Sequence, residues 1–288
     1  MKFNFLLIGI LFLILLLIPM VIFGQDKNLL HIKSTKEVGQ IEVGGPYVGI
    51  EIHKSFPLLN RISFYYPVAN SIDISDDYWK RENFKIMSVG LKVGSLPKRM
   101  LENEIYEVDQ TPYSVSFTKE NFDSEIKISY EFCKNEPAMV VTFIITNKSK
   151  VEKDYEIFTR LEAILRTSHS YNLKNSAYTE FEDNGSVIRI NYPEIETGNA
   201  QIFIVNAGLH PVSFTTAEKI DSRFSNLDDW WINTDSSLPS KTIQKENPGK
   251  PAAAFIYKKK LASNTSIKIV QIIGSSKITE EMKKQIIC

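Results

Sequence analysis

The 288-residue chain is poor in the residues that build metal sites and disulfide frameworks. It has two cysteines, Cys133 and Cys288, and four histidines. Zinc sites need several Cys and His residues at ligand spacing, and disulfide scaffolds need cysteines at framework spacing, so no metal or cofactor site is expected. The favoured interpretation of the cysteines is a buried thiol and a loose terminal thiol, with an intrachain disulfide as the alternative.

An excess of charge of either sign is also missing. Lys plus Arg and Asp plus Glu each total 34, which gives a formal net charge of zero. The basic residues are scattered among acids, whereas a nucleic-acid binder gathers them into a patch that neutralises phosphates. A nucleic-acid partner is therefore not expected. The hydrophobic content of 43% is enough for a core and argues against intrinsic disorder.

The N-terminus carries one lysine and then an uncharged, mostly apolar run from Phe3 to Gln25. A short positive start, an apolar run and the small residue Gly24 before a polar stretch are typical of a secretory signal, so residues 1–24 are predicted to be a signal peptide. The alternative is an uncleaved membrane anchor, because the run is about as long as the roughly 20 residues that cross a bilayer. Either way, the folded part is expected outside the cytoplasm, periplasmic or extracellular, and would meet a membrane only through this segment.

The rest of the chain is a series of short runs that alternate apolar and polar residues between Gly, Pro, Asn and Asp. This pattern predicts an all-β, antiparallel sandwich of about fourteen strands over residues 37–275, after a polar lead-in at 25–36. The apolar, β-branched run Met139–Thr146 predicts a central strand that is covered on both faces. Tyr155–Leu165 alternates with a period of two, which favours a strand over the helix suggested by its end, LEAIL.

Three further segments are set apart by their composition. Asn184 and Gly185 between two apolar runs predict a hairpin turn. The polar segment 217–251 predicts a functional or flexible loop. Residues 276–288 predict a short helix with apolar residues at helical spacing, which either leads into another domain or packs back on the sheet.

The stretch Phe56–Arg81 interleaves aromatic rings with Asn, Asp and Arg side chains. Rings cover the apolar side of a sugar and polar groups bind its hydroxyls, so Tyr66, Trp79 and Arg81 are candidate substrate-binding residues. The favoured alternative for this stretch is a packing surface. Two adjacent rings, Trp230 and Trp231, form a second candidate, since soluble proteins rarely expose such rings without a use.

Catalysis has weaker support in the sequence. Glycoside hydrolysis needs two carboxyl groups that flank the bond. Acids adjacent in sequence are more often turn formers or solvated surface than a catalytic pair. An epimerase needs a carboxylate base and an imidazole acid, and His169, in a loop, is the best-placed histidine, although a non-catalytic histidine is the favoured interpretation. The acid clusters are Asp73, Asp76 and Asp77; Asp228 and Asp229; and Glu180, Glu182 and Asp183.

The segments LNRISFYYPVANSID, DYWKR and VTFIITNKSKVEKDYEIFTRLEAIL, in this order in a chain with an export signal, resemble a known kind of domain. It is the galactose mutarotase-like supersandwich domain that precedes the (α/α)6 barrel in several bacterial glycoside hydrolases, and the resemblance covers residues 37–287. It implies a large antiparallel supersandwich with a short C-terminal helix, packed on a catalytic barrel that carries the catalytic carboxylates. No barrel is encoded here.

The sequence therefore favours an exported, non-catalytic, carbohydrate-associated module, with a carbohydrate and an (α/α)6 catalytic domain as partners. A stand-alone aldose epimerase-like enzyme and a structural interaction module are the alternatives.

Overall fold

The computed structural model places most of the residues between Leu29 and Ser275. The candidates Tyr66, Trp79, Arg81 and His169 lie outside the described residues, as do the apolar N-terminal run and the expected C-terminal helix. The ranges described are 29–34, 40–53, 57–64, 72–74, 85–102, 104–121, 123–162, 165–166, 177–182, 185–195, 198–216, 223–238, 244–247 and 252–275.

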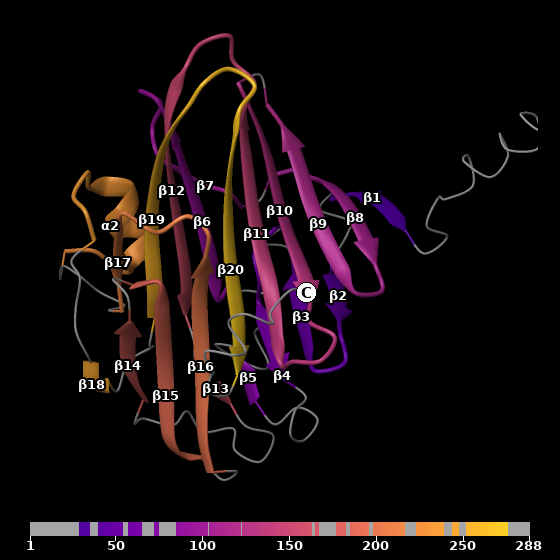
Figure 1. Ribbon diagram of the computed structural model, residues 1–288, viewed down its shortest axis with the longest axis vertical. Helices are drawn as coiled ribbons and strands as arrows, with labels where there is room; N and C mark the ends of the chain where they lie inside the picture. Colours follow the sequence, from indigo (N-terminus) through magenta and orange to yellow (C-terminus); the bar gives the residue numbers. More distant parts are fainter. Residues whose placement is uncertain are drawn as a thin grey trace, which may run out of the picture.

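Antiparallel strands dominate the described residues, which confirms the all-β prediction. The described residues form twenty strands in three sheets, together with one short helix. The large sheet crosses the molecule from β1 to β18 (Figure 1). In spatial order it contains β1 (Leu30–Lys33), β8 (Glu107–Thr111), β9 (Ser114–Glu120), β10 (Ser124–Phe132), β11 (Ala138–Asn147), β20 (Ser266–Ser275), β16 (Gly198–Ala207), β15 (Val187–Ile195), β14 (Ala177–Glu182) and β18 (Gln244–Asn247).

Two five-stranded sheets accompany the large sheet. The second sheet contains, in spatial order, β17 (Ser213–Thr215), β19 (Ala252–Leu261), β12 (Lys153–Glu162), β6 (Met87–Val93) and β7 (Arg99–Met100). The third sheet contains β13 (Leu165–Arg166), β5 (Ile72–Ile74), β4 (Arg61–Phe64), β3 (Val48–His53) and β2 (Gln40–Gly44).

One main core joins the three sheets. Alternate residues of a strand point to opposite faces, so the longer strands contribute side chains from one face to it. Phe143 of the large sheet, Ile157 of the second and Phe64 of the third are each at most 1% exposed and belong to this cluster. Burying one such side chain stabilises the fold by about 1.5–3 kcal/mol.

Three local predictions are confirmed. The run Met139–Thr146 lies in β11, between β10 and β20, as predicted for a central strand, and its core face is buried. On its other face only Thr142 is buried, so the expected cover on both faces is partial. The ambiguous segment is a strand, β12, with β13 after it. The predicted hairpin joins β14 to β15, where Glu182 pairs with Val187 and Gly185 has a φ of 84°.

Two segments expected to lack regular structure contain some. The lead-in includes β1, which pairs along its length with β8. The polar segment 217–251 includes helix α2 (Leu227–Asn233) and β18. The strand count exceeds fourteen because several strands have only two to five residues, and such short strands depend on their neighbours for pairing.

The favoured interpretation of Cys133 as a free thiol is wrong. Cys133 is 5% exposed and disulfide-bonded. A short exposed turn, 134–137, separates it from β11, so the cysteine sits at the end of the β10–β11 hairpin. The other cysteine, Cys288, lies outside the described residues.

No helix within the described ranges is long and apolar enough to cross a membrane.

A charged cleft on the second sheet

Helix α2 organises the outer face of the second sheet, the face turned away from the main core. The helix begins after Asn226, whose side-chain oxygen accepts a hydrogen bond from the backbone N–H of Asp229 at 2.9 Å. Asp228 and Asp229 lie in the first turn, where negative charge is favourable. Figure 1 shows α2 at the side of the molecule near β17 and β19.

The two tryptophans of α2 are not exposed, which corrects the expectation that they present rings to a sugar. Trp230 is 4% and Trp231 is 0% exposed. Both belong to a small apolar cluster between the helix and the outer face of the second sheet. Neither ring offers a free face for stacking on a pyranose.

Trp231 lies flat on the sheet. Its ring stacks on Phe158 of β12, with centroids 5.2 Å apart and planes inclined by 13°. A β-carbon built on Gly90 of β6 would lie 2.3 Å from a ring carbon of Trp231. Position 90 therefore requires glycine, because any side chain there would displace the indole.

The buried indole also holds a carboxylate at the edge of the helix. Trp231 Nε1 donates a hydrogen bond to Glu156 Oε1 at 2.9 Å, and the other carboxylate oxygen lies 3.1 Å from Lys258 Nζ. Lys98 Nζ lies 3.6 Å from the same carboxylate and 5.1 Å from the Trp231 ring centroid. It also donates to the backbone oxygens of Trp231 and Thr234, so it caps the C-terminal end of α2.

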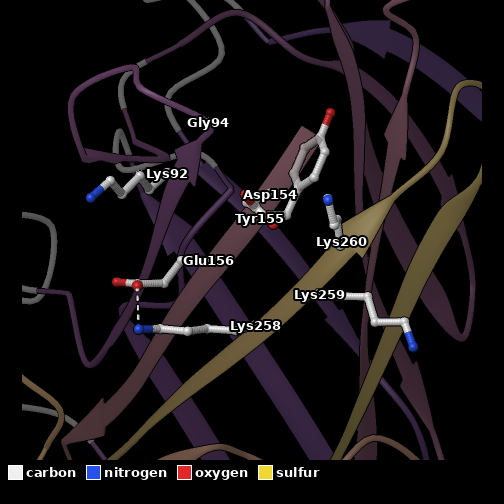
Figure 2. Close-up of a pocket in the computed structure, with 8 residues that line it drawn as sticks. All are labelled: Lys92, Gly94, Asp154, Tyr155, Glu156, Lys258, Lys259 and Lys260. Atoms are coloured by element: carbon white, nitrogen blue, oxygen red, sulfur yellow. Dashed lines mark ion pairs between the residues drawn. The ribbon is translucent and has the colours of Figure 1, made fainter. Parts of the chain in front are cut away.

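An open cleft of about 380 Å³ begins at this carboxylate. Glu156 of β12 lies directly between Lys92 of β6 and Lys258 of β19 in the strand register. The dashed ion pair in Figure 2 joins Glu156 to Lys258, whereas Lys259 points the other way, as alternation along a strand requires. The lining residues are Lys92, Gly94, Asp154, Tyr155, Glu156, Lys258, Lys259 and Lys260.

Further ion pairs surround the cleft. Lys92 Nζ lies 3.2 Å from Asp235 Oδ1, and this contact lowers the pKa of the exposed Asp235 carboxyl. Lys260, opposite Asp154 in the register, pairs at 3.0 Å with Glu152, whose hydrogen bond raises the pKa of that lysine. Positive and negative groups therefore alternate around the opening.

The chemistry available in the cleft is hydrogen bonding by charged groups. Ammonium groups donate and carboxylates accept, a combination that suits a ligand with many hydroxyls. No histidine is among the lining residues. Within the described ranges, no group of three or more His, Cys, Asp or Glu residues is arranged to hold a metal ion.

A buried ion-pair network fastens the start of α2 to the same face. Arg160 of β12 donates to both carboxylate oxygens of Asp228, at 2.7 and 3.1 Å, and Ser88 of β6 donates to the second oxygen at 2.6 Å. Burial raises the pKa of Asp228, but the charge and hydrogen bonds of Arg160 outweigh it, so the pKa is lowered overall. Lys85 lies 3.8 Å from this carboxylate.

The other predicted acids and histidines are dispersed. Asp229 accepts hydrogen bonds from Ser225 and Asn233 of its own segment. Glu180 and Glu182 accept hydrogen bonds from Asn191 and Arg189 of β15. Asp73 lies on β5, while Asp76, Asp77 and Asp183 lie outside the described residues. His31 is on β1, His53 is on β3, and His210 is exposed between β16 and β17.

One part of this site has a signal in the sequence. Asn226 followed by two acids and two tryptophans is an N-terminal helix signal, and it predicts α2. In β12 the charged Asp154 and Glu156 flank the buried Tyr155, and in β19 three lysines follow a buried apolar run, but which lysine faces which acid depends on strand register. That register is a tertiary property.

Similarity to known proteins is found in the fold and not in the sequence. No protein-family model and no curated protein matches the chain. Among solved structures, the chain is similar to a polysaccharide lyase, with 12% identity over 83% of this chain and 34% of that chain and a TM-score of 0.49. It thus spans about a third of that protein's length.

Two further structures are of related kinds. A galactose mutarotase-like protein from Lactobacillus casei has 8% identity, 83% and 100% coverage of the two chains and a TM-score of 0.48. A protein described as a kojibiose phosphorylase from the human microbiome has 10% identity, 91% and 35% coverage and a TM-score of 0.49. At these values the likenesses are not grounds for assigning a ligand or an activity.

Proposed function

We propose that the chain is an exported, non-catalytic, carbohydrate-associated module, and that the cleft beside Trp231 contacts the saccharide. The observation that carries this proposal is the fixed carboxylate of Glu156. One of its oxygens accepts from a fully buried indole and the other faces an amine, in an opening of about 380 Å³. A preorganised acceptor flanked by donors can bind sugar hydroxyls without first being ordered.

The geometry favours binding over catalysis. A glycosidase places two carboxyl groups on either side of the bond to be broken. The two acids of the cleft, Asp154 and Glu156, instead follow each other on the same face of one strand, and each lies opposite a lysine of β19. An epimerase would need an imidazole beside a carboxylate, and no histidine lines this cleft.

Export and a catalytic partner belong to the same proposal. The apolar N-terminal run supports export, and so does the disulfide at Cys133, because disulfides persist mainly outside the cytoplasm. The sequence resemblance supports an (α/α)6 catalytic domain as the partner, in the same or a neighbouring chain. The module would then hold a polysaccharide near the barrel or pack on it.

Oligosaccharide binding tests the proposal directly. The protein is screened against neutral and acidic oligosaccharides, and the affinity for the best ligand is measured by calorimetry. Lys258→Met keeps the length of the side chain but removes the amine, and we expect at least a tenfold loss of affinity. Lys268→Met, an exposed lysine on β20 of the large sheet, is the matched control and should bind like the parent.

Two outcomes would count against this function. Equal loss of affinity in both lysine variants would place binding elsewhere on the surface. Faster interconversion of sugar anomers in the presence of the parent protein, followed by polarimetry, would favour the epimerase alternative.

A further inference from the structure

A third, separate apolar cluster lies on the outer face of the large sheet. Strand alternation places it opposite the main core: Met139, Ile204 and Ile273 point inward, so the residues next to them point outward. Its buried members come from the end of the β10–β11 hairpin and from β16 and β20, and Val140, Val205 and Ala207 pack around them. The buried members are Cys133, Ala138, Phe203 and Ile272.

This outer cluster is more buried than an open sheet face would make it. Phe203 is 1% and Ile272 6% exposed. Gly274 explains part of this, because the Phe203 ring lies where a β-carbon of residue 274 would be, 2.3 Å from it. Val140 and Val205, the register partners of Ile272, flank its side chain, so what they and the glycine leave to be covered is the outward side of the cluster.

The chain itself passes this cluster where β20 ends. The backbone N–H of Ser275, the last residue of β20, donates to Pro137 O at 3.0 Å. One residue further along, Ala138 O accepts from the N–H of Cys133 at 3.0 Å. Residues 276–288 therefore start beside Cys133, and thirteen residues can span up to about 45 Å when extended.

The cysteine content of the chain identifies the residue that can bond to Cys133. Cys133 is disulfide-bonded, and the chain has one other cysteine, Cys288. The segment between Ser275 and Cys288 carries Ile278, Met282 and Ile286 at a spacing of four, which puts them on one side of a helix.

We propose that residues 276–288 fold back over the outer cluster and are fastened there by a disulfide between Cys133 and Cys288. Ile278, Met282 and Ile286 face Phe203 and Ile272 and exclude water from them. Of the two predictions for this segment, packing on the sheet is thus preferred to a free linker. The occupant of this face is the chain's own C-terminal segment rather than a second copy.

The bond requires an oxidant. Each thiol gives up one proton and one electron, and a disulfide donor is reduced to two thiols as the Cys133–Cys288 bond forms. A disulfide-exchanging protein of an oxidising compartment supplies this in the cell, and oxidised glutathione supplies it in the test.

The first experiment maps the bond in the full chain. The protein is oxidised with oxidised glutathione, digested without reductant, and its linked peptides are identified by mass spectrometry. We expect one linked pair, Cys133 with Cys288, from a monomeric band on a non-reducing gel. A disulfide-linked dimer, or two free thiols under these conditions, would overturn the proposal.

The second experiment tests docking without the bond. In Cys288→Ser, the rate of alkylation of Cys133 reports whether the segment still covers it. Adding Met282→Gln should raise that rate at least tenfold, because it removes an apolar contact with the cluster. Adding Lys284→Gln, which would lie on the opposite side of the same helix, should leave the alkylation rate of Cys133 unchanged. If Met282→Gln has no effect, the segment does not lie on this face.

Discussion

The indole nitrogen of Trp231 lies 2.9 Å from Glu156 Oε1 and donates a hydrogen bond to it, although the tryptophan is fully buried and the carboxylate borders an open cleft. The pair connects the packing of α2 on the second sheet to the polar lining of the cleft. The ring is therefore a positioning residue for the carboxylate, and Phe158 and Gly90 fix the plane of the ring.

Replacing Trp231 by Phe should therefore affect both stability and binding. The substitution keeps an aromatic ring but removes the N–H, so a carboxylate oxygen that is largely buried loses its donor at a cost of about 1–3 kcal/mol. The smaller ring also leaves a cavity, which adds to this cost. Denaturant unfolding measures the first effect, and saccharide affinity, if the cleft binds as proposed, measures the second.

Trp230→Phe is the matched control, because Trp230 is 4% exposed in the same helix and its indole makes no hydrogen bond to the residues described. It should lose stability but keep affinity. Equal losses of affinity in both variants would show that the helix as a whole, rather than the Trp231 to Glu156 hydrogen bond, supports the cleft.

Gly90→Ala should destabilise the protein by about 1–3 kcal/mol, the usual cost of overpacking a core. The new methyl group would lie 2.3 Å from the Trp231 ring, so the ring must move. The two sites are coupled, and the cost of Gly90→Ala should fall to well under half in a Trp231→Leu background. An undiminished cost in that background would mean that the backbone of β6, and not the ring, is what resists the substitution.

The contact of Arg160 with Asp228 should behave as a buried ion pair. Arg160→Leu leaves the buried Asp228 carboxylate without its main partner, and breaking such a pair costs about 3–5 kcal/mol. The double variant Arg160→Leu with Asp228→Leu should recover part of that stability, because the Asp228 charge is no longer buried without Arg160. Glu162, which also accepts a hydrogen bond from Arg160, loses that partner in both Arg160 variants. Chemical denaturation of the two single variants and the double variant gives the coupling energy; additive losses would contradict a direct interaction.

Acid unfolding should report on the same carboxyl group. The pKa of Asp228 is lowered in the folded protein, so its contribution to stability is present above the unfolded pKa of about 3.9 and is lost as the pH falls through the folded pKa. Asp228→Asn removes this dependence. Its unfolding free energy should therefore fall less steeply with pH below about 4 than that of the parent, in urea titrations at several pH values.

The pairing of the edge strand β1 with β8 should lose stability as the pH rises, whereas the contribution of Asp228 is lost as the pH falls. His31 Nδ1 lies 2.6 Å from Asp109 and Nε2 lies 3.4 Å from Glu107, and the hydrogen bond to Asp109 raises the pKa of His31. A raised pKa means that the stabilisation is complete below the unfolded value of about 6.5 and is lost as the pH rises through the folded value. Lys33 also faces Glu107, at 3.1 Å, and forms a second ion pair between the two strands.

An NMR titration of His31 checks this prediction. Asp109→Asn removes the largest cause of the shift, so the pKa of His31 should fall toward its ordinary value. Glu107→Gln should lower it by less. Hydrogen-exchange protection factors along β1, which correct for the intrinsic pH dependence of exchange, should fall above the folded pKa of His31. Equal protection factors on both sides of that pH would show that the titration does not affect the pairing of the strand.

Much of the architecture follows from local pattern. Period-two alternation identifies β12 despite the helical propensity of its end, because the buried faces of Ile157 and Leu161 require it. The uninterrupted apolar run identifies β11 as central. Short strands such as β7 and β17 were not predicted, because two or three residues carry no periodicity and pair only where a neighbouring strand is already in place.

In the candidate site, the local sequence pattern did not predict which side chains are buried. Two adjacent tryptophans in a polar segment gave the prediction of exposed, sugar-stacking rings, yet both are buried. The prediction failed because a short helix folds the segment onto the sheet. What decides the burial is Gly90, some 140 residues earlier in the chain, which leaves room for the indole.

By itself the sequence determined the all-β class, the central strand, the hairpin at Gly185 and the balance of charge, because each depends on residues close together in the chain. The tertiary structure decided which groups meet: Lys92, Glu156 and Lys258 in one row, Trp231 beneath Glu156, and Cys133 beside the end of β20. These contacts depend on strand register and on how the sheets pack. A shift of one residue in β6, β12 or β19 would turn Lys92, Glu156 or Lys258 to the opposite face.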